Sequence, residues 1–309
     1  MARPMQVMWY INPNDGPFPW SPKGRIKPDL MRSREIAVTL DRRGFMEKLT
    51  KLAGSGAAAA AIAPMLSSNY AQAQIVPPDD SRLKIENVAF PGPTGEMKGY
   101  LAIPADATGK LPAVLVIHEN RGLNPHIKDV TRRMALEGFV ALGVDLLSRV
   151  GGTPATDDEA AALFKDIDRD ALVPDAVSAI AYLKGSPATN GNVGAIGFCF
   201  GGGIVNQLAV ASPDLKAGVA YYGGQAKEGI DKIKSKLMLH YAGLDEHINA
   251  GIPDYEKALK AAGVDYQLFL YEDVNHAFNN DTSAARYDKT AADLAWSRTV
   301  AFLKESLAG

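Results

Sequence analysis

A cysteine between two glycines is the residue of this 309-residue chain whose type and setting best suit chemistry. Cys199 lies in Gly-Phe-Cys-Phe-Gly at 197–201 and is the only cysteine in the chain. A short apolar run, 193–196, precedes this turn, and residues suited to a helix, 204–210, follow it. A tight turn from strand to helix exposes its central side chain, and glycines allow the two elements to approach closely. The pattern predicts either a nucleophilic thiol or a buried, inert cysteine, because free cysteine is among the most buried residue types.

Two groups that could activate a nucleophile follow later predicted strands. Asp245 comes shortly after the apolar segment 237–241, and His276 comes shortly after the segment 266–271. A histidine can take the proton of a thiol, and a carboxylate behind it fixes the tautomer and stabilises the imidazolium. We therefore predict a catalytic triad of Cys199, Asp245 and His276. The alternatives for the acid and the base are Glu246, His240 and His247.

The loop after the first long apolar run carries further polar groups. Glu119 is either an ordinary surface residue or a group that hydrogen-bonds the thiol or accepts its proton. Acyl transfer also needs two donors aimed at the developing oxyanion, and the backbone N–H groups of Asn120 and Phe200 are the candidates. Arg121 either pairs with Glu119 or Asp145, or binds a substrate carboxylate in bidentate fashion.

A scaffold of alternating strands and helices is expected to position these residues. The expected strands are 82–90, 96–103, 113–118, 139–144, 193–196, 217–222, 237–241 and 266–271. The expected helices are 125–137, 157–164, 173–183, 204–210, 253–262 and 284–307. Continuous apolar strands alternating with helices predict an α/β fold with a mostly parallel sheet and helices on both faces. Sites lie beyond the carboxyl ends of such strands, where the loops after 118, 196, 241 and 271 should meet.

Composition excludes several classes of function. The chain is 47% hydrophobic and 22% charged, which is typical of a soluble globular protein. Its net charge of −2 offers no surface for nucleic acid. One cysteine cannot form an intramolecular disulfide, and no cluster of cysteine and histidine suggests a zinc site.

The first 82 residues differ in composition from the rest. Residues 1–40 are rich in proline, glycine and tryptophan and read as an extension that is disordered or artefactual, with Met31 a candidate true start. Arg42 and Arg43 then open a charged segment, followed by an alanine-rich stretch, 52–66, and Ala-Gln-Ala at 71–73. These are the parts of a twin-arginine signal, although an amphipathic helix with an alanine-rich tail is the alternative.

This pattern divides the chain into four parts. We predict an extension over 1–40, a signal peptide over 41–73, a linker over 74–82 and one catalytic domain over 83–309. The signal predicts export to the periplasm by the twin-arginine machinery. Its apolar stretch is too short and too interrupted by glycine for a stable membrane span.

The chain resembles the dienelactone hydrolase family, the carboxymethylenebutenolidases of the α/β-hydrolase superfamily. The matching motifs run in order between about 83 and 307: Glu119 after its strand, Asp145-Leu146, the cysteine turn at 197–202, Gly-Leu-Asp at 243–245 and Asn-His-Ala-Phe at 275–278. The resemblance implies an α/β-hydrolase fold without metal or organic cofactor. It also implies that Cys199, His276 and Asp245 form the triad and that Glu119 modulates the thiol. The expected reaction is hydrolysis of a lactone or small ester through an acyl-thiol intermediate.

The chain departs from the family pattern where the substrate is recognised. Family members that act on dienelactone have an arginine soon after the His-x-Phe run, whereas this chain has Phe-Asn-Asn-Asp at 278–281. For a second family arginine, upstream of the cysteine, Arg169 is the candidate. We therefore expect the hydrolase chemistry to carry over better than the specificity for dienelactone. The alternatives are a general carboxylesterase or thioesterase on the same triad, and a non-catalytic binding protein with an inert thiol.

Overall fold

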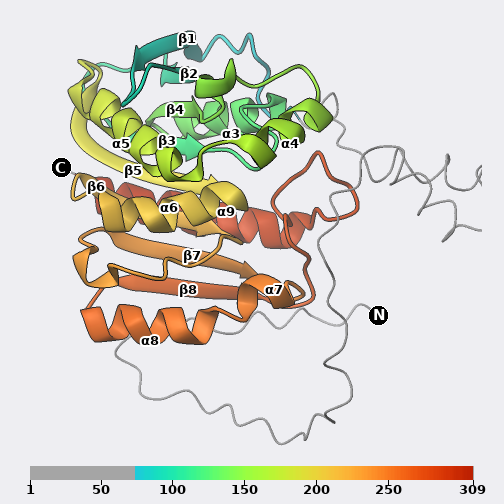
Figure 1. The fold of residues 1–309 in the computed structure, drawn as a ribbon. Coiled ribbons are helices and arrows are strands. Elements are labelled where there is room, and N and C mark those ends of the chain that lie inside the picture. Colours follow the sequence, from blue (N-terminus) through green and yellow to red (C-terminus); the bar gives the residue numbers. More distant parts are fainter. Residues whose placement is uncertain (1–73, 309) are drawn as a thin grey trace, which may run out of the picture.

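The computed structural model describes residues 74–308 (Figure 1). The predicted extension, 1–40, and the predicted signal peptide, 41–73, lie outside the described residues, so export stays a prediction from sequence. Within the described range no helix is both long and apolar enough to cross a membrane. In the segment predicted as a linker, Val76 is buried on the domain. Its N–H donates to Asp129 Oδ1 at 2.8 Å, and its carbonyl accepts from Arg132 Nε at 2.7 Å.

One eight-stranded sheet forms the centre of the described domain, in the order β1-β2-β4-β3-β5-β6-β7-β8. Its strands are β1 (Leu83–Pro91), β2 (Glu96–Pro104), β3 (Leu111–Ile117), β4 (Val140–Asp145), β5 (Thr189–Phe198), β6 (Leu215–Tyr221), β7 (Lys236–Ala242) and β8 (Tyr266–Tyr271). The pairs β1–β2 and β2–β4 are antiparallel. All the other pairs are parallel, which confirms the predicted mostly parallel sheet.

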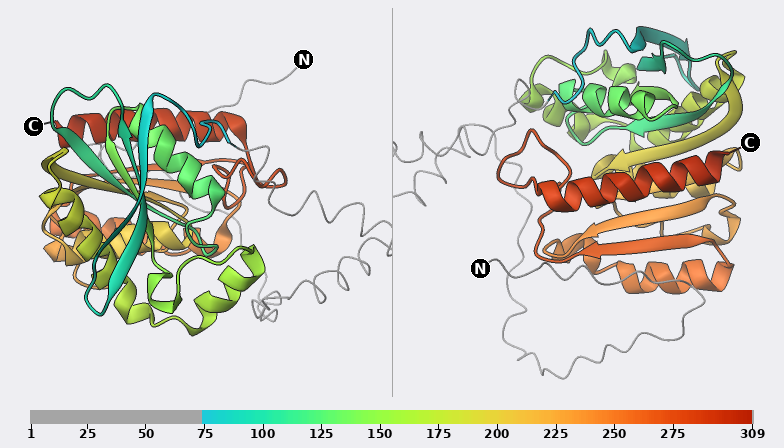
Figure 2. Two further views of the ribbon diagram at one scale, coloured as in Figure 1. Left: turned by 90° about the horizontal axis from the view of Figure 1, so that it is seen from above. Right: turned by 180° about the vertical axis from the view of Figure 1, so that it is seen from behind.

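Helices cover both faces of the sheet, as expected. One face carries α4 (Asp157–Asp166), α5 (Arg169–Gly185), α6 (Phe200–Ala211) and α8 (Ile252–Ala262). The other carries α3 (Pro125–Leu136) and the long α9 (Lys289–Leu307), the red helix that crosses the molecule in the rear view of Figure 2. Strand β3 shows why two cores form. Leu115 and Ile117 pack with α5 and α6 while Val114 and Val116 pack with α3, because successive side chains point to opposite faces.

Several element boundaries differ from the expectation: β5 and α6 each begin four residues earlier than expected, and helix caps explain two further differences. Helix α9 begins at Lys289 and not at 284, because Asp288 caps it by accepting the N–H of Ala291 at 2.8 Å. Helix α5 begins at Arg169, before Pro174, which lies inside the helix. Asp168 caps this earlier start, and its side chain accepts the N–H of Asp170 at 3.1 Å. The earlier start matters for the site because it places Arg169 at the first turn of α5.

Candidate active site

Cys199 lies at the sharp turn between β5 and α6, in a strained backbone conformation. Its φ of 53° and ψ of −113° are rare for any residue except glycine. The Cys199 N–H donates to the carbonyl of Tyr221 at 3.0 Å, and the Gly203 N–H donates to the carbonyl of Cys199 at 3.1 Å. Such strain costs about 1–3 kcal/mol and persists where the surrounding structure enforces it, often at functional sites.

The glycines on either side of Cys199 are required by close backbone contacts. A Cβ at position 197 would lie 2.2 Å from the carbonyl oxygen of Gly201. A Cβ at position 201 would lie 2.4 Å from the carbonyl oxygen of Ile117 and 2.6 Å from that of His118. The predicted close approach of strand and helix is therefore confirmed. Gly201 also brings the start of α6 against the end of β3, beside the loop that carries Glu119.

His276 and Asp245 meet beyond the ends of β8 and β7. His276 Nδ1 lies 2.5 Å from Asp245 Oδ2, and Asp245 Oδ1 accepts the N–H of Ile248 at 3.3 Å as the cap of α7 (Glu246–Asn249). Two residues with positive φ, Asp273 at 59° and Ala277 at 67°, shape the loop that presents the histidine. A neutral imidazole whose Nδ1–H donates to the carboxylate keeps Nε2 as its proton acceptor.

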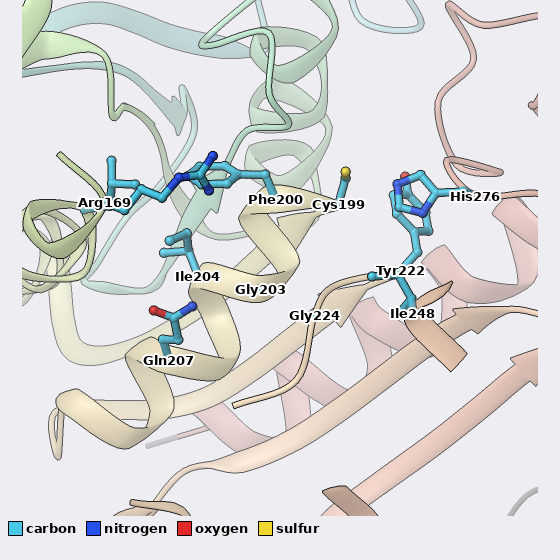
Figure 3. A pocket seen from close by; sticks show the side chains of 11 residues that line it. Arg169, Cys199, Phe200, Gly203, Ile204, Gln207, Tyr222, Gly224, Ile248 and His276 are labelled. Atoms are coloured by element: carbon cyan, nitrogen blue, oxygen red, sulfur yellow. The ribbon is translucent and has the colours of Figure 1, made fainter. Parts of the chain in front are cut away.

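Cys199 and His276 line one cavity of about 280 Å³ (Figure 3). Phe200 and Ile204 of α6 form one wall, and Tyr222, whose ring centroid lies 4.9 Å from that of His276, forms part of another. The structure thus brings together the three residues of the predicted triad. They follow β5, β7 and β8, three strands that run in parallel.

The two alternative histidines are placed elsewhere. His240 is fully buried inside β7, with ring nitrogens 3.1 Å from Thr299 Oγ1 and 2.9 Å from the hydroxyl of Tyr271. Its burial, helped by the charge of Arg298, lowers the pKa of His240 to about 3, so it stays neutral. His247 is exposed on α7 and is not among the residues lining the cavity.

Glu119 is buried, unlike most glutamates, with 7% of its surface exposed. Its Oε2 accepts from the amide of Asn280 at 2.7 Å, and its Oε1 has no hydrogen-bond partner among the described residues. Burial, above all, and then the negative charge of Glu119 raise the pKa of the Cys199 thiol to about 12. The resting thiol is therefore protonated at neutral pH.

The two candidate oxyanion donors lie at the start of α6 and in the turn after β3. Phe200 is the first residue of α6, where an N–H has no partner within the helix. This N–H is directed at the sulfur of Cys199 and opposes the rise in its pKa. Asn120 is exposed in the turn after β3, next to the point where Gly201 contacts the strand end.

The structure corrects the expected partners of Arg121 and Asp145. Arg121 Nη1 donates to the carbonyl of Asp157 at 2.9 Å, and Arg121 is not among the cavity-lining residues. Asp145 accepts hydrogen bonds from the N–H and the hydroxyl of Thr153, at 2.7 and 2.8 Å. These bonds stabilise the loop that follows β4. Long side chains can turn either way from a strand end, which is why spacing did not reveal these partners.

Arg169 is the arginine that lines the cavity (Figure 3). Tyr222 and Asn280 were not predicted as site residues. Tyr222 has a φ of 38°, and the glycines after its strand were the available signal. Asn280 contacts Glu119 across 161 residues of chain, and no local pattern reports such a contact. Among residues 74–308, no group of three or more histidine, cysteine or acidic side chains could hold a metal ion.

Comparisons with known proteins find similarity to dienelactone hydrolases in both sequence and structure. The model of the "Dienelactone hydrolase family" matches residues 97–307. A relative from Saccharolobus solfataricus, named "Putative carboxymethylenebutenolidase", is 33% identical over an alignment of 248 residues. The match covers 68% of this chain and 94% of that protein. The crystal structure of a dienelactone hydrolase-like promiscuous phosphotriesterase from metagenomic libraries is similar with a TM-score of 0.65 at 25% identity. That similarity covers 74% of this chain and 100% of the other. The structure titled "Putative Dienelactone Hydrolase" from Klebsiella pneumoniae gives a TM-score of 0.65 at 27% identity, covering 72% and 99%.

Proposed function

Because this chain belongs to the dienelactone hydrolase family, we propose that it cleaves a lactone or small carboxylic ester with Cys199 as its nucleophile. It has the α/β-hydrolase fold and is a carboxylic-ester hydrolase. The observation that carries the proposal is the contact between His276 Nδ1 and Asp245 Oδ2, 2.5 Å apart, at a cavity that Cys199 also lines. A histidine held in this way is oriented to exchange protons with a group in that cavity.

The first half of the proposed reaction forms an acyl-thiol. His276 Nε2 takes the proton of the Cys199 thiol as the sulfur adds to the carbonyl carbon of the substrate. The oxyanion that results accepts hydrogen bonds from the N–H groups of Phe200 and Asn120. The bond between the carbonyl carbon and the ester oxygen then breaks, and the imidazolium gives its proton to the departing oxygen.

The second half releases the acid. His276 takes a proton from a water molecule while the water oxygen adds to the acyl carbon. The carbon–sulfur bond breaks, and the proton on His276 returns to the thiolate. Asp245 accepts from Nδ1–H throughout and stabilises the imidazolium in both halves.

The proposed substrate range follows from the polar groups at the cavity. Asn280 lies four residues after His276, and its amide donates to Glu119, so this position presents no cation. Arg169 is the cation among the cavity-lining residues, and we propose that it binds the acidic group of any anionic substrate. Neutral esters and lactones fit the remaining lining, which is largely apolar.

Replacing Cys199 with alanine is expected to lower the rate of ester hydrolysis by more than about 10³-fold, because the nucleophile is lost. The measurement is the release of p-nitrophenol from p-nitrophenyl acetate by the purified protein. Peptide mapping by mass spectrometry after rapid acid quenching should find the acetyl group on Cys199 of the parent protein. Ser186→Ala, at a half-buried position beyond α5, is the control for a small change in side-chain volume. If the folded Cys199→Ala protein keeps its activity, Cys199 is not the nucleophile.

Alkylation of Cys199 should be slow at neutral pH and faster in Glu119→Gln. The raised pKa favours the protonated thiol, so the thiolate fraction at pH 7–8 lies below that of a free thiol. Removing the charge of Glu119 lowers the pKa of the Cys199 thiol. The rate of alkylation should then rise by roughly tenfold for each pH unit by which this pKa falls. The measurement is the rate of iodoacetamide labelling between pH 6 and 10, with Glu86→Gln, an exposed position, as control. An equal or slower rate in Glu119→Gln would show that this carboxylate does not hold the thiol protonated.

A further inference from the structure

A second hollow of about 440 Å³ adjoins the cavity of the candidate active site. Gln207 of α6 lines both hollows. On α5, Leu172 lines the first hollow and Val173 the second, and in the segment after β6, Gly224 lines the first and Gln225 the second. The same three walls therefore continue from one hollow to the next. The two hollows thus lie next to each other along these three segments, and we call the pair the α5–α6 groove.

One face of α6 forms the floor of this groove. Phe200, Gly203, Ile204, Gln207 and Val210 line it in turn, at the spacing of three and four residues that places side chains on the same helix face. At 1.5 Å of rise per residue, the floor from the first to the last of them is about 15 Å long. Figure 3 shows the first part of this row leading away from Cys199 along α6.

Part-buried hydrogen bonds hold Gln225 in the wall opposite α6. Gln225 Nε2 donates to the carbonyl of Ile248 at 3.0 Å and to the hydroxyl of Tyr241 at 3.4 Å. A Cβ at Gly251 would lie 2.4 Å from Gln225 Oε1, so the glycine leaves room for this side chain in its present position. Gln225 thus joins the wall of the second hollow to Ile248, which lines the first.

The lining of the groove suits a hydrocarbon chain. Leu172 and Ile204 are apolar near the thiol. At the far end Val173, Val210 and Ala226 form an apolar strip, which is bordered by four polar or charged residues, Gln207, Gln225, Lys227 and Glu228. An apolar strip of this kind can contact an unbranched hydrocarbon chain, while the polar groups at its border stay in contact with water. The direction of the groove decides which part of an ester enters it. His276 must stand beside the departing oxygen to protonate it, and in Figure 3 it lies on the other side of Cys199 from Gln207.

We propose that the α5–α6 groove is an acyl-chain subsite, which makes esters of medium-length, unbranched aliphatic acids good substrates. The proposal rests on the proposed function, because it takes the acyl group to be the part bonded to Cys199. The chain runs from the thiol over Ile204 and Gln207 and ends against Val210. The alcohol side of the ester lies towards His276.

The test is a series of p-nitrophenyl esters with one alcohol and acyl chains of two, four and eight carbons. We expect kcat/KM to rise from acetate to octanoate by about tenfold or more, as additional methylenes enter an apolar site. Gln207→Trp fills the junction of the two hollows, and Val210→Glu places a charge at the far end. Each should lower the octanoate-to-acetate ratio of kcat/KM by about tenfold. Lys257→Trp, at an exposed position of α8, should leave the ratio unchanged.

A ratio that stays the same in both Gln207→Trp and Val210→Glu overturns the subsite while leaving ester hydrolysis intact. If no ester is hydrolysed, the proposed function fails. A binding experiment then tests the acyl-chain subsite independently of the reaction. In Cys199→Ala, octanamide should bind at least about tenfold more tightly than acetamide by calorimetry, and Gln207→Trp should remove the difference. Equal binding of the two amides would disprove the subsite whatever the reaction is.

Discussion

Replacing His276 with glutamine is expected to lower kcat for ester hydrolysis by about 10³–10⁴-fold, with little change in KM. The glutamine side chain fills a similar volume, but its amide cannot take the proton of the Cys199 thiol. The effect should be large in this protein because burial and Glu119 raise the pKa of Cys199 to about 12, so hardly any thiolate exists without a base. The measurement is steady-state hydrolysis of p-nitrophenyl acetate between pH 6 and 10.

The matched control for this change is His247→Gln. His247 is exposed on α7, only two residues from Asp245, and lies outside the cavity lining. We expect its kcat to remain within about twofold of the parent value, as for surface changes away from the site. If His276→Gln keeps the activity of the parent, or if His247→Gln loses it, the assignment of the base is wrong. Rate recovery in His276→Gln with rising pH would fit a reaction limited by the thiolate.

Replacing Gly201 with alanine is expected to destabilise the fold by about 3 kcal/mol or more, the upper end for an overpacked core site. The new Cβ would lie 2.4 Å from the carbonyl oxygen of Ile117, and both partners are backbone atoms that cannot rotate away. The start of α6 would have to move from β3, which displaces Cys199 from His276. The measurement is the free energy of unfolding in urea, together with activity in the fraction that stays folded.

Gly185→Ala is the control for the same chemical change. Gly185 ends α5, and a Cβ there would have no atom within 4 Å. Alanine in place of glycine reduces the conformational freedom of the unfolded chain, so we expect stability to stay the same or rise by about 0.4–1 kcal/mol. A Gly201→Ala protein that is as stable as the parent would contradict the close approach of α6 and β3.

Several features of the site could be predicted because they depend on local pattern and on the topology of a parallel sheet. Cys199 follows β5, Asp245 follows β7 and His276 follows β8, so the carboxyl ends of parallel strands bring them to one edge. Glycines at 197 and 201 indicated a close strand-to-helix contact for the same local reason. Element bounds were less exact where a cap decided them, as Asp168 does for α5 and Asp288 for α9.

Features that depend on the direction of long side chains could not be predicted. Arg121 turns to the carbonyl of Asp157 and does not line the cavity. Arg169, which only the family resemblance had suggested, does line it. The α5–α6 groove likewise has no sequence signature, because its walls come from three segments that meet only in the folded domain.

The turn at Cys199 shows which properties the sequence determines and which depend on the tertiary structure. The sequence alone determined that a thiol would stand on a strained strand-to-helix turn, because the glycines, the apolar run and the helix-forming residues are neighbours in the chain. Only the tertiary structure decided the state of that thiol. Its pKa depends on the burial of the sulfur and on Glu119, which Asn280 holds from a loop 161 residues away. Electrostatic interactions act through space at short range, so they follow the folded arrangement and not the order of residues.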